Sequence, residues 1–285
     1  MIRTRTIGNL FYETFSIFTK CLYSFGVIAI CVFGPLSLIS ILGPSQESLQ
    51  TSLNQAQTAS EMLAYLFSGY GLYTIGLSIL TIFAITVGFS ALSIAAVQYI
   101  NDKEVNLETC LKQVSWRLLS IILMTGILII SIITTMFGFL LFIPTIGLLA
   151  AFGIGVFFLT LISLLVTVHE GEKYFAAIKR GFKLVENTLL RVAGTMILIT
   201  IIGVFTKIIL DLLFTKIILD LPKLFIISSV NNEIILYKIL FEAVGLISIS
   251  TSVTIMSISV TLMYLDMRIR FEEFDDNKLS NQTRI

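Results

Sequence analysis

The chain of 285 residues is strongly apolar and poorly charged, with 56% hydrophobic and 13% charged residues. Soluble domains average about 45–50% apolar and about 25% charged residues, so this chain lacks the charge to cover a water-soluble core. A formal net charge of +1 offers no basic face for a nucleic acid, and we expect no nucleic-acid partner. These numbers predict an integral membrane protein.

The apolar runs favour helices over a β-barrel. Several of them are long enough to cross a hydrocarbon core of about 30 Å as a helix. Barrel strands alternate polar and apolar residues, and runs such as 118–133 and 192–204 show no alternation. The sequence therefore predicts an all-α integral membrane protein with about six transmembrane helices.

Six spans are expected in chain order. They lie at about 23–42, 73–97, 118–141, 146–168, 192–214 and 241–264. A stretch rich in Gln, Ser and Thr (45–60) follows the first span, and a short uncharged break (142–145) joins spans three and four. We expect a single polytopic membrane domain over 1–285, with a short charged tail at 266–285.

Lys and Arg are unevenly distributed over the connections. Fifteen of the 19 basic residues lie in the N-terminal segment, the connections 101–117 and 169–191, and the tail. With six spans these segments share one side of the membrane, and basic residues concentrate on the cytoplasmic side. We therefore expect a multi-pass protein of a plasma or inner membrane with both termini in the cytoplasm.

An amphipathic segment precedes each pair of spans. The apolar positions that share one side of a helix are Ile7, Leu10, Phe11, Thr14 and Phe18, then Leu107, Cys110, Leu111, Val114 and Leu118, then Phe175, Ile178, Phe182, Val185 and Leu189. We expect each segment to lie in the membrane interface. The pattern predicts three repeats of an interfacial helix plus a transmembrane hairpin, at 6–100, 104–168 and 172–265.

The third amphipathic segment is the most basic. Its charges are Lys173, Lys179, Arg180, Lys183 and Arg191. Anionic lipid headgroups attract clustered cations at a membrane surface. We expect these residues to contact headgroups, with the lipid bilayer as partner; the sequence indicates no particular protein partner.

Three stretches carry a family resemblance. They are the opening Arg5-Thr6-Ile7-Gly8 with Phe11 and Phe15, the basic helix 177–185, and an ending that includes Tyr264, Asp266, Arg268, Arg270, Glu272 and Asp275. Together they resemble the glycerophosphoryl diester phosphodiesterase membrane-domain family. The ending is the most specific, because that family tends to close on Tyr-x-Asp-x-Arg-x-Arg-x-Glu-x-x-Asp.

The resemblance implies a stand-alone membrane domain. In some relatives the membrane bundle is fused to a phosphodiesterase barrel with paired carboxylates, histidines and a metal. This chain has one histidine and about twenty residues beyond the last expected span, which is too few for a barrel of about 250 residues. We do not carry over the hydrolase activity.

His169, Glu170 and Glu172 form a polar group where span four leaves the membrane. A metal site is one interpretation, but no second histidine or thiol completes a ligand set. We expect solvated surface here. Lys238 and Glu242 near the start of span six are expected to pair at the headgroups as i and i+4 neighbours.

Two stripes of small or hydroxyl residues lie within the spans. Span six carries Ser250, Thr254, Ser257 and Thr261 on one side of a helix, and span four carries Gly147, Ala151 and Gly155. The hydroxyl stripe could line a solute path, whereas helix packing explains both stripes equally well. We favour packing.

A short duplication lies near the end of span five. Thr-Lys-Ile-Ile-Leu-Asp-Leu occurs at 206–212 and again at 215–221. A spacing of nine residues would put the two charge pairs on opposite faces of one continuous helix. We therefore expect a break near Phe214 and a second, interface-lying segment that Pro222 ends.

The sequence lacks the usual signals of catalysis. We find no phosphate-binding glycine loop, nucleophile elbow, HExxH or paired-cysteine site, and we expect no enzyme, no catalytic or metal residues and no cofactor. The leading hypothesis is a structural, anchoring or partner-docking bundle. The alternatives are a transporter or channel subunit that uses the hydroxyl stripe, and a phospholipid-related activity suggested by the family name alone.

Overall fold

The computed structural model describes residues 6–44, 58–140, 144–186, 189–224 and 230–272, which are almost entirely helical. Six helices are long and apolar enough to cross a membrane: α2 (Leu22–Leu42), α5 (Gly69–Ile100), α7 (Leu118–Leu140), α8 (Pro144–Glu170), α10 (Leu189–Leu224) and α11 (Val230–Glu272). The shorter helices are α1 (Ile7–Lys20), α4 (Ala59–Leu66), α6 (Leu107–Trp116) and α9 (Phe175–Val185). The prediction of an all-α membrane protein with six spans is confirmed.

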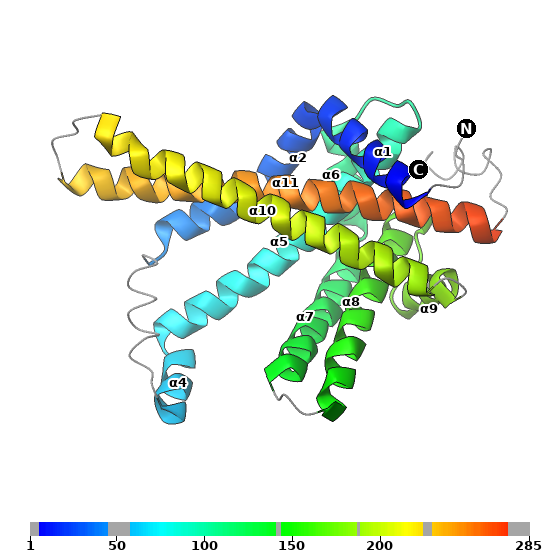
Figure 1. Ribbon diagram of the computed structural model, residues 1–285, viewed down its shortest axis with the longest axis horizontal. Coiled ribbons are helices and arrows are strands. Elements are labelled where there is room, and N and C mark those ends of the chain that lie inside the picture. Colours follow the sequence, from blue (N-terminus) through cyan, green and yellow to red (C-terminus); the bar gives the residue numbers. More distant parts are fainter. Residues whose placement is uncertain (1–5, 45–57, 141–143, 187–188, 225–229, 273–285) are drawn as a thin grey trace.

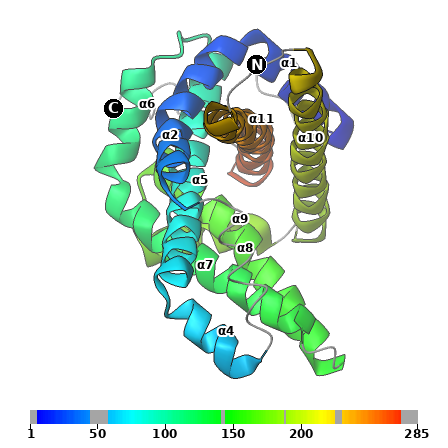
Figure 2. The ribbon, with the colours of Figure 1, turned by 90° about the vertical axis from the view of Figure 1, so that its left-hand side faces the viewer.

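Helix α11 is the central element of the structure. It packs against α1, α2, α5, α8, α9 and α10. Helices α10 and α11 run side by side along the long axis, and the hairpin of α7 and α8 projects away from them (Figure 1). The view at 90° shows the same divergence, with α11 seen nearly end-on and α10 foreshortened beside it (Figure 2). The two hairpins therefore meet near α9 and spread apart toward their far ends.

The order of helices follows the pattern that the repeat predicts. A short helix precedes two long ones three times along the chain, with α4 as an addition between α2 and α5. Helices α1 and α6 begin at the side-chain caps Thr6 and Asn106, whose oxygens accept from backbone N–H groups of the first turn. The ancestry of these units as repeats stays a prediction.

Glycines mark the closest helix contacts. A Cβ at Gly153 of α8 would lie 2.9 Å from the backbone N of Thr135 of α7, and one at Gly203 of α10 would lie 2.6 Å from Met256 of α11. Hydroxyls bond to the same glycine carbonyls: Ser131 Oγ donates to Gly153 O (2.6 Å) and Ser252 Oγ to Gly203 O (2.8 Å). Without a hydrophobic driving force between helices in lipid, such close approach and hydroxyl bonds hold the hairpins together.

The expected close-contact stripe of span four is wrong in register. A Cβ at Gly155 would meet nothing within 4 Å, and Ala151 is exposed; the side chain of residue 147 lies outside the description. Gly153 lies two residues before Gly155, about 200° away around the helix, and makes the contact with α7 instead. The spacing of small residues does not by itself say which side of the helix meets a neighbour.

The expected break near Phe214 is also wrong. Helix α10 continues from Leu189 through Phe214 to Leu224. Lys207 Nζ lies 2.5 Å from Asp211 Oδ2 one turn away. Lys207 and Asp211 neutralise each other within one turn, so they do not need to lie on the same face of the helix as the charges of the second copy. One helix can therefore continue through both copies of the duplicated segment.

We expect Gly153→Ala to destabilise the α7–α8 hairpin, because the added methyl overpacks a site with no space beside the Thr135 backbone. Overpacking of this kind costs about 1–3 kcal/mol. Gly126→Ala in α7 is the matched control, since a Cβ there meets nothing within 4 Å and alanine favours a helix by about 1 kcal/mol over glycine. Thermal unfolding in detergent should show a lower midpoint for the first variant and an equal or higher midpoint for the second; equal midpoints for both variants would contradict the contact.

Candidate functional site

Glu170, the last residue of α8, is the centre of a charged cluster. The Tyr264 hydroxyl of α11 donates to Glu170 Oε1 at 2.6 Å, and Arg180 Nε of α9 lies 2.9 Å from Oε2. Arg268 Nε of α11 lies 3.5 Å from Oε1. The side chains of Glu170 and Arg268 are only 9% and 7% exposed. One carboxylate therefore joins three helices at the end where α8 and α10 meet.

Aromatic stacking extends this cluster. The His169 ring stacks on Tyr264 with centroids 5.8 Å apart, and the Arg268 guanidinium lies 5.8 Å from the Tyr264 ring centroid. His169 Nε2 is inaccessible to solvent and has no hydrogen-bond partner among the described residues. These contacts fix the His169 side chain against α11.

The expectation of solvated surface at 169–172 is wrong for two of its three residues. His169 and Glu170 pack against α11, and only Glu172 is exposed. The physical reason is that α11 does not end near Tyr264. It continues to Glu272, with Asp266 and Arg268 buried, so the expected charged tail begins as part of a packed helix.

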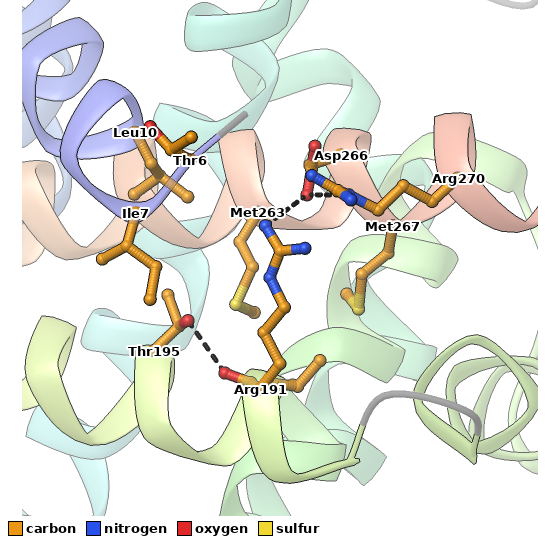
Figure 3. Close-up of a pocket in the computed structure, with 10 residues that line it drawn as sticks. Thr6, Ile7, Leu10, Arg191, Thr195, Met263, Asp266, Met267 and Arg270 are labelled. Carbon is orange, nitrogen blue, oxygen red and sulfur yellow. Dashed lines mark hydrogen bonds and ion pairs between the residues drawn. The ribbon is translucent and has the colours of Figure 1, made fainter. Parts of the chain in front are cut away.

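A second cluster lies on the other side of α11. Asp266 Oδ2 lies 2.8 Å from Arg270 Nε one turn later and 3.4 Å from Arg191 Nη2 at the start of α10. Figure 3 shows Arg191 reaching across to Asp266, with Thr195 donating to the Arg191 carbonyl behind it. A cavity of about 20 Å³ beside them, lined also by Thr6 of the loop before α1, has room for about one water.

The end of α8 is capped by α6. Arg117 Nη1 donates to Thr167 O at 2.7 Å, and Gln113 Nε2 donates to Val168 O at 3.3 Å. Both carbonyls belong to the last turn of α8, where helical partners are missing and a cation opposes the helix dipole. Burial lowers the pKa of Arg117 from its ordinary value. Gly171 follows with φ +81°, a conformation that other residues rarely adopt, and turns the chain toward α9.

The C-terminal motif of the family resemblance supplies both clusters. Tyr264 and Arg268 face Glu170, whereas Asp266 and Arg270 pair beside Arg191. Residues two positions apart on a helix point in nearly opposite directions, about 200° apart. Alternate residues of the motif therefore contact partners on two sides of α11. Glu272 ends the described helix, its side chain undescribed, and Asp275 lies outside the described residues.

The basic residues expected at lipid headgroups divide into two groups. Lys173, Lys179 and Lys183 are exposed. Arg180 is paired with Glu170, and Arg191 with Asp266. The two arginines thus have intramolecular ion pairs, and the three lysines remain the better candidates for lipid contact.

The hydroxyl stripe of span six packs between helices. Thr254, Ser257 and Thr261 are at most 2% exposed, and Ser250 is 9% exposed. Ser257 Oγ donates to Phe89 O of α5 at 2.8 Å, while Thr254 and Thr261 bond to carbonyls of their own helix. The stripe is therefore a helix contact between α11 and α5 at Ser257.

Lys238 and Glu242 bond to α2 and its end. Lys238 Nζ donates to Gly43 O at 2.8 Å, and Glu242 Oε1 accepts from Ser40 Oγ at 2.6 Å. The expected pairing of the two residues with each other is replaced by bonds to the neighbouring span. These two hydrogen bonds join α11 to α2 at a position far from the Glu170 cluster.

Chemically, the two clusters can neutralise buried charge and hold helix ends together. Among the described residues, no group of three His, Cys, Asp or Glu side chains could hold a metal ion. Sequence reasoning missed Glu170 as a centre of interactions. The available signal was the spacing of Tyr264 and Arg268, which puts an aromatic hydroxyl and a cation on one side of α11.

We expect Glu170→Gln to lower the free energy of unfolding by about 3 kcal/mol, because Arg180 and buried Arg268 lose the charge of Glu170 while the shape of the site is kept. Glu172→Gln, an exposed carboxylate two residues away, is the matched control and should have little effect. Unfolding of the detergent-solubilised protein in a denaturant series measures both. Equal stability of the two variants would refute a central role for Glu170.

The thiol of Cys110 reports on the docking of α6. Cys110 is buried, its Sγ donates to Gln98 Oε1 of α5 at 3.5 Å, and burial raises its pKa to about 11. In a Cys21→Ser, Cys31→Ser background, we expect maleimide to modify it about 100-fold more slowly at pH 8 than an ordinary thiol, because the thiolate is the reactive form. The rate should rise with pH toward about 11 in the folded protein. Fast labelling at pH 8 without denaturant would show that α6 is not docked as described.

Comparison with known proteins adds no relative: no family model, no curated protein and no solved structure matches the chain. The resemblance of the C-terminal motif to the glycerophosphoryl diester phosphodiesterase membrane-domain family therefore stays a prediction. What the structure does establish is a helical protein with six helices suited to span a membrane, in which ion pairs of Glu170 and Asp266 lie where α8, α9, α10 and α11 meet.

Proposed function

We propose that this protein is a non-enzymatic scaffold of a plasma or inner membrane that anchors or docks partners at its cytoplasmic face, with both termini in the cytoplasm. The observation that carries the proposal is the use of its buried charge. Glu170 and Asp266 are engaged in ion pairs that fix helix ends, and no reacting group is left poised beside a cavity that a substrate could enter. This statement applies to the part of the chain that the structure describes.

The exposed lysines of α9 support contact with anionic headgroups. Lys173, Lys179 and Lys183 lie at the same end of the molecule as the two clusters, while Ala177, Gly181 and Leu184 bury the other side of α9. Fixed by the Arg180–Glu170 pair, α9 would hold its lysines at the depth of lipid phosphates. Each lysine near an anionic surface contributes about 1 kcal/mol.

A transporter or channel subunit remains the second hypothesis, and the hydroxyl stripe was its main support. Those hydroxyls now have packing roles, most clearly Ser257 against Phe89. A phospholipid-related enzyme would need a cluster of acidic or histidine side chains open to substrate, whereas Glu170 is enclosed by Tyr264 and two arginines. The scaffold is the hypothesis that the described contacts favour.

Energy transfer from the single tryptophan tests the lipid contact in the full chain. Trp116 is 82% exposed at the end of α6, near the same end of the molecule as α9. We expect Lys179→Gln with Lys183→Gln to reduce transfer from Trp116 to headgroup-labelled anionic lipid, while transfer to labelled zwitterionic lipid is unchanged. The anionic preference should also fall at high salt, because exposed charges are screened.

Lys207→Gln with Lys216→Gln is the matched control. These lysines lie on α10 far along the chain from its start at Leu189, so they remove the same charge from another part of the molecule. Their substitution should leave the Trp116 signal as it is. An unchanged anionic preference in the Lys179 and Lys183 variant would remove the headgroup contact from the proposal.

A further inference from the structure

Two apolar cavities adjoin each other between α8 and α10. The first, about 270 Å³, is lined by α8, α9 and α10, with Gly155, Phe182 and Val192 among its residues. The second, about 340 Å³, is lined by α7, α8 and α10 and includes Ile201. Phe158 lines both cavities. Phe158 lies between them, because the other α8 residues that line them are on different sides of that helix: Gly155 and Leu159 for the first cavity, Ile154 and Phe157 for the second. We call the first cavity the cleft; it is far larger than the water-sized cavity at Arg191.

The cleft is a consequence of where the close contacts lie. Gly153 brings α8 against α7, and Gly181 brings α9 against Ser163 of α8, whereas Gly203 brings α10 against α11. Gly155 faces the cleft instead, and a Cβ there would meet nothing within 4 Å. Each hairpin is thus closed within itself, and the two hairpins diverge (Figures 1 and 2). Residues of both hairpins and of α9 line the cleft.

We propose that this cleft binds one acyl chain of a membrane phospholipid, with the phosphate at α9. The lining runs along α8 from Phe152 to Ile162, which is about 15 Å at the helical rise of about 1.5 Å per residue. Half of a hydrocarbon core of about 30 Å is about 15 Å. The cleft therefore has the length of the acyl chains of a single leaflet.

Access and charge fit the same ligand. Phe152 at the cleft is 66% exposed, so a chain can enter sideways from the bilayer. At the end that α9 forms, Phe182 lines the cleft, and Lys179 and Lys183 are exposed within one turn of it. A phosphate at these lysines would leave its acyl chain directed along α8 and α10.

Different observations support the phosphate contact and the acyl-chain site. The phosphate contact rests on the proposed function, because it needs α9 at the headgroups. The acyl-chain site rests on the cleft and on the membrane-spanning helices alone.

Native mass spectrometry of the full chain released from vesicles tests the acyl-chain site. The vesicles contain equal amounts of an anionic and a zwitterionic phospholipid with identical acyl chains. We expect one retained phospholipid per chain in the wild type, and retention about tenfold lower in Gly155→Leu, whose side chain fills the cleft. Gly194→Leu is the matched control on exposed α10 surface outside the cleft, and should retain lipid as the wild type does.

Equal retention by Gly155→Leu and the wild type would overturn the site. The variant Lys179→Gln with Lys183→Gln tests the headgroup contact separately from the acyl-chain site. If it still binds lipid but no longer prefers the anionic lipid, both the headgroup contact and the acyl-chain site are supported. If it still binds lipid and keeps the anionic preference, the headgroup contact is refuted and the acyl-chain site is retained.

Cross-linking in the bilayer provides a second measurement that does not depend on any variant folding. A phospholipid with a photoreactive group in the middle of its acyl chain is mixed into vesicles with the wild-type protein. We expect adducts to concentrate on Phe158 and Leu159 of the cleft, above the level at Leu212, which is exposed on α10 outside it. Labelling that simply follows exposure along α10, or adducts between two protein chains across the cleft, would overturn the proposal.

Discussion

The arrangement of the whole molecule depends on α11 having charged partners on two opposite sides. On one side Tyr264 and Arg268 meet Glu170, and on the other Asp266 meets Arg191. A carboxylate taken out of water needs both a counter-charge and hydrogen bonds, and Glu170 receives them from α9 and α11 together. The hairpin that contains α8 and the hairpin that contains α10 are thereby fixed to each other at one end. Beyond that end, packing between their lipid-exposed parts determines how far they stay together.

The spans could be predicted from the sequence because their signal is local. An apolar run of sufficient length must be a helix in a bilayer, whatever its neighbours do. The interior of the fold is different, since it depends on which side of a helix meets which partner. Gly153 and Gly155 are chemically identical, and only the position of α7 makes one of them a contact and leaves the other facing a cleft.

The charged groups were harder to place for a related reason. The sequence showed Glu170 at the end of one span and the Tyr264 motif at the end of another, more than ninety residues later. Their meeting required α11 to continue past Tyr264, which hydropathy alone does not reveal because the added turns carry charge. The repeated segment ending at 221 misled in the opposite direction: its charges suggested a break, but the pair of Lys207 and Asp211 is neutralised within one turn.

The bond between Thr14 and Ser259 joins residues 245 positions apart, with their oxygens at 3.2 Å. Helix α1 is therefore completed by α11, which is synthesised much later. At roughly 5–20 residues per second, α1 waits on the order of tens of seconds before the surface that buries Leu10 and Thr14 has been synthesised. Glu170 can meet Arg180 early, but it must wait for Tyr264 and Arg268 in the same way. Helix α11 must therefore pack between elements that were synthesised before it. During that interval α1 must be kept at the membrane surface by its own apolar side or by the machinery that inserts the chain.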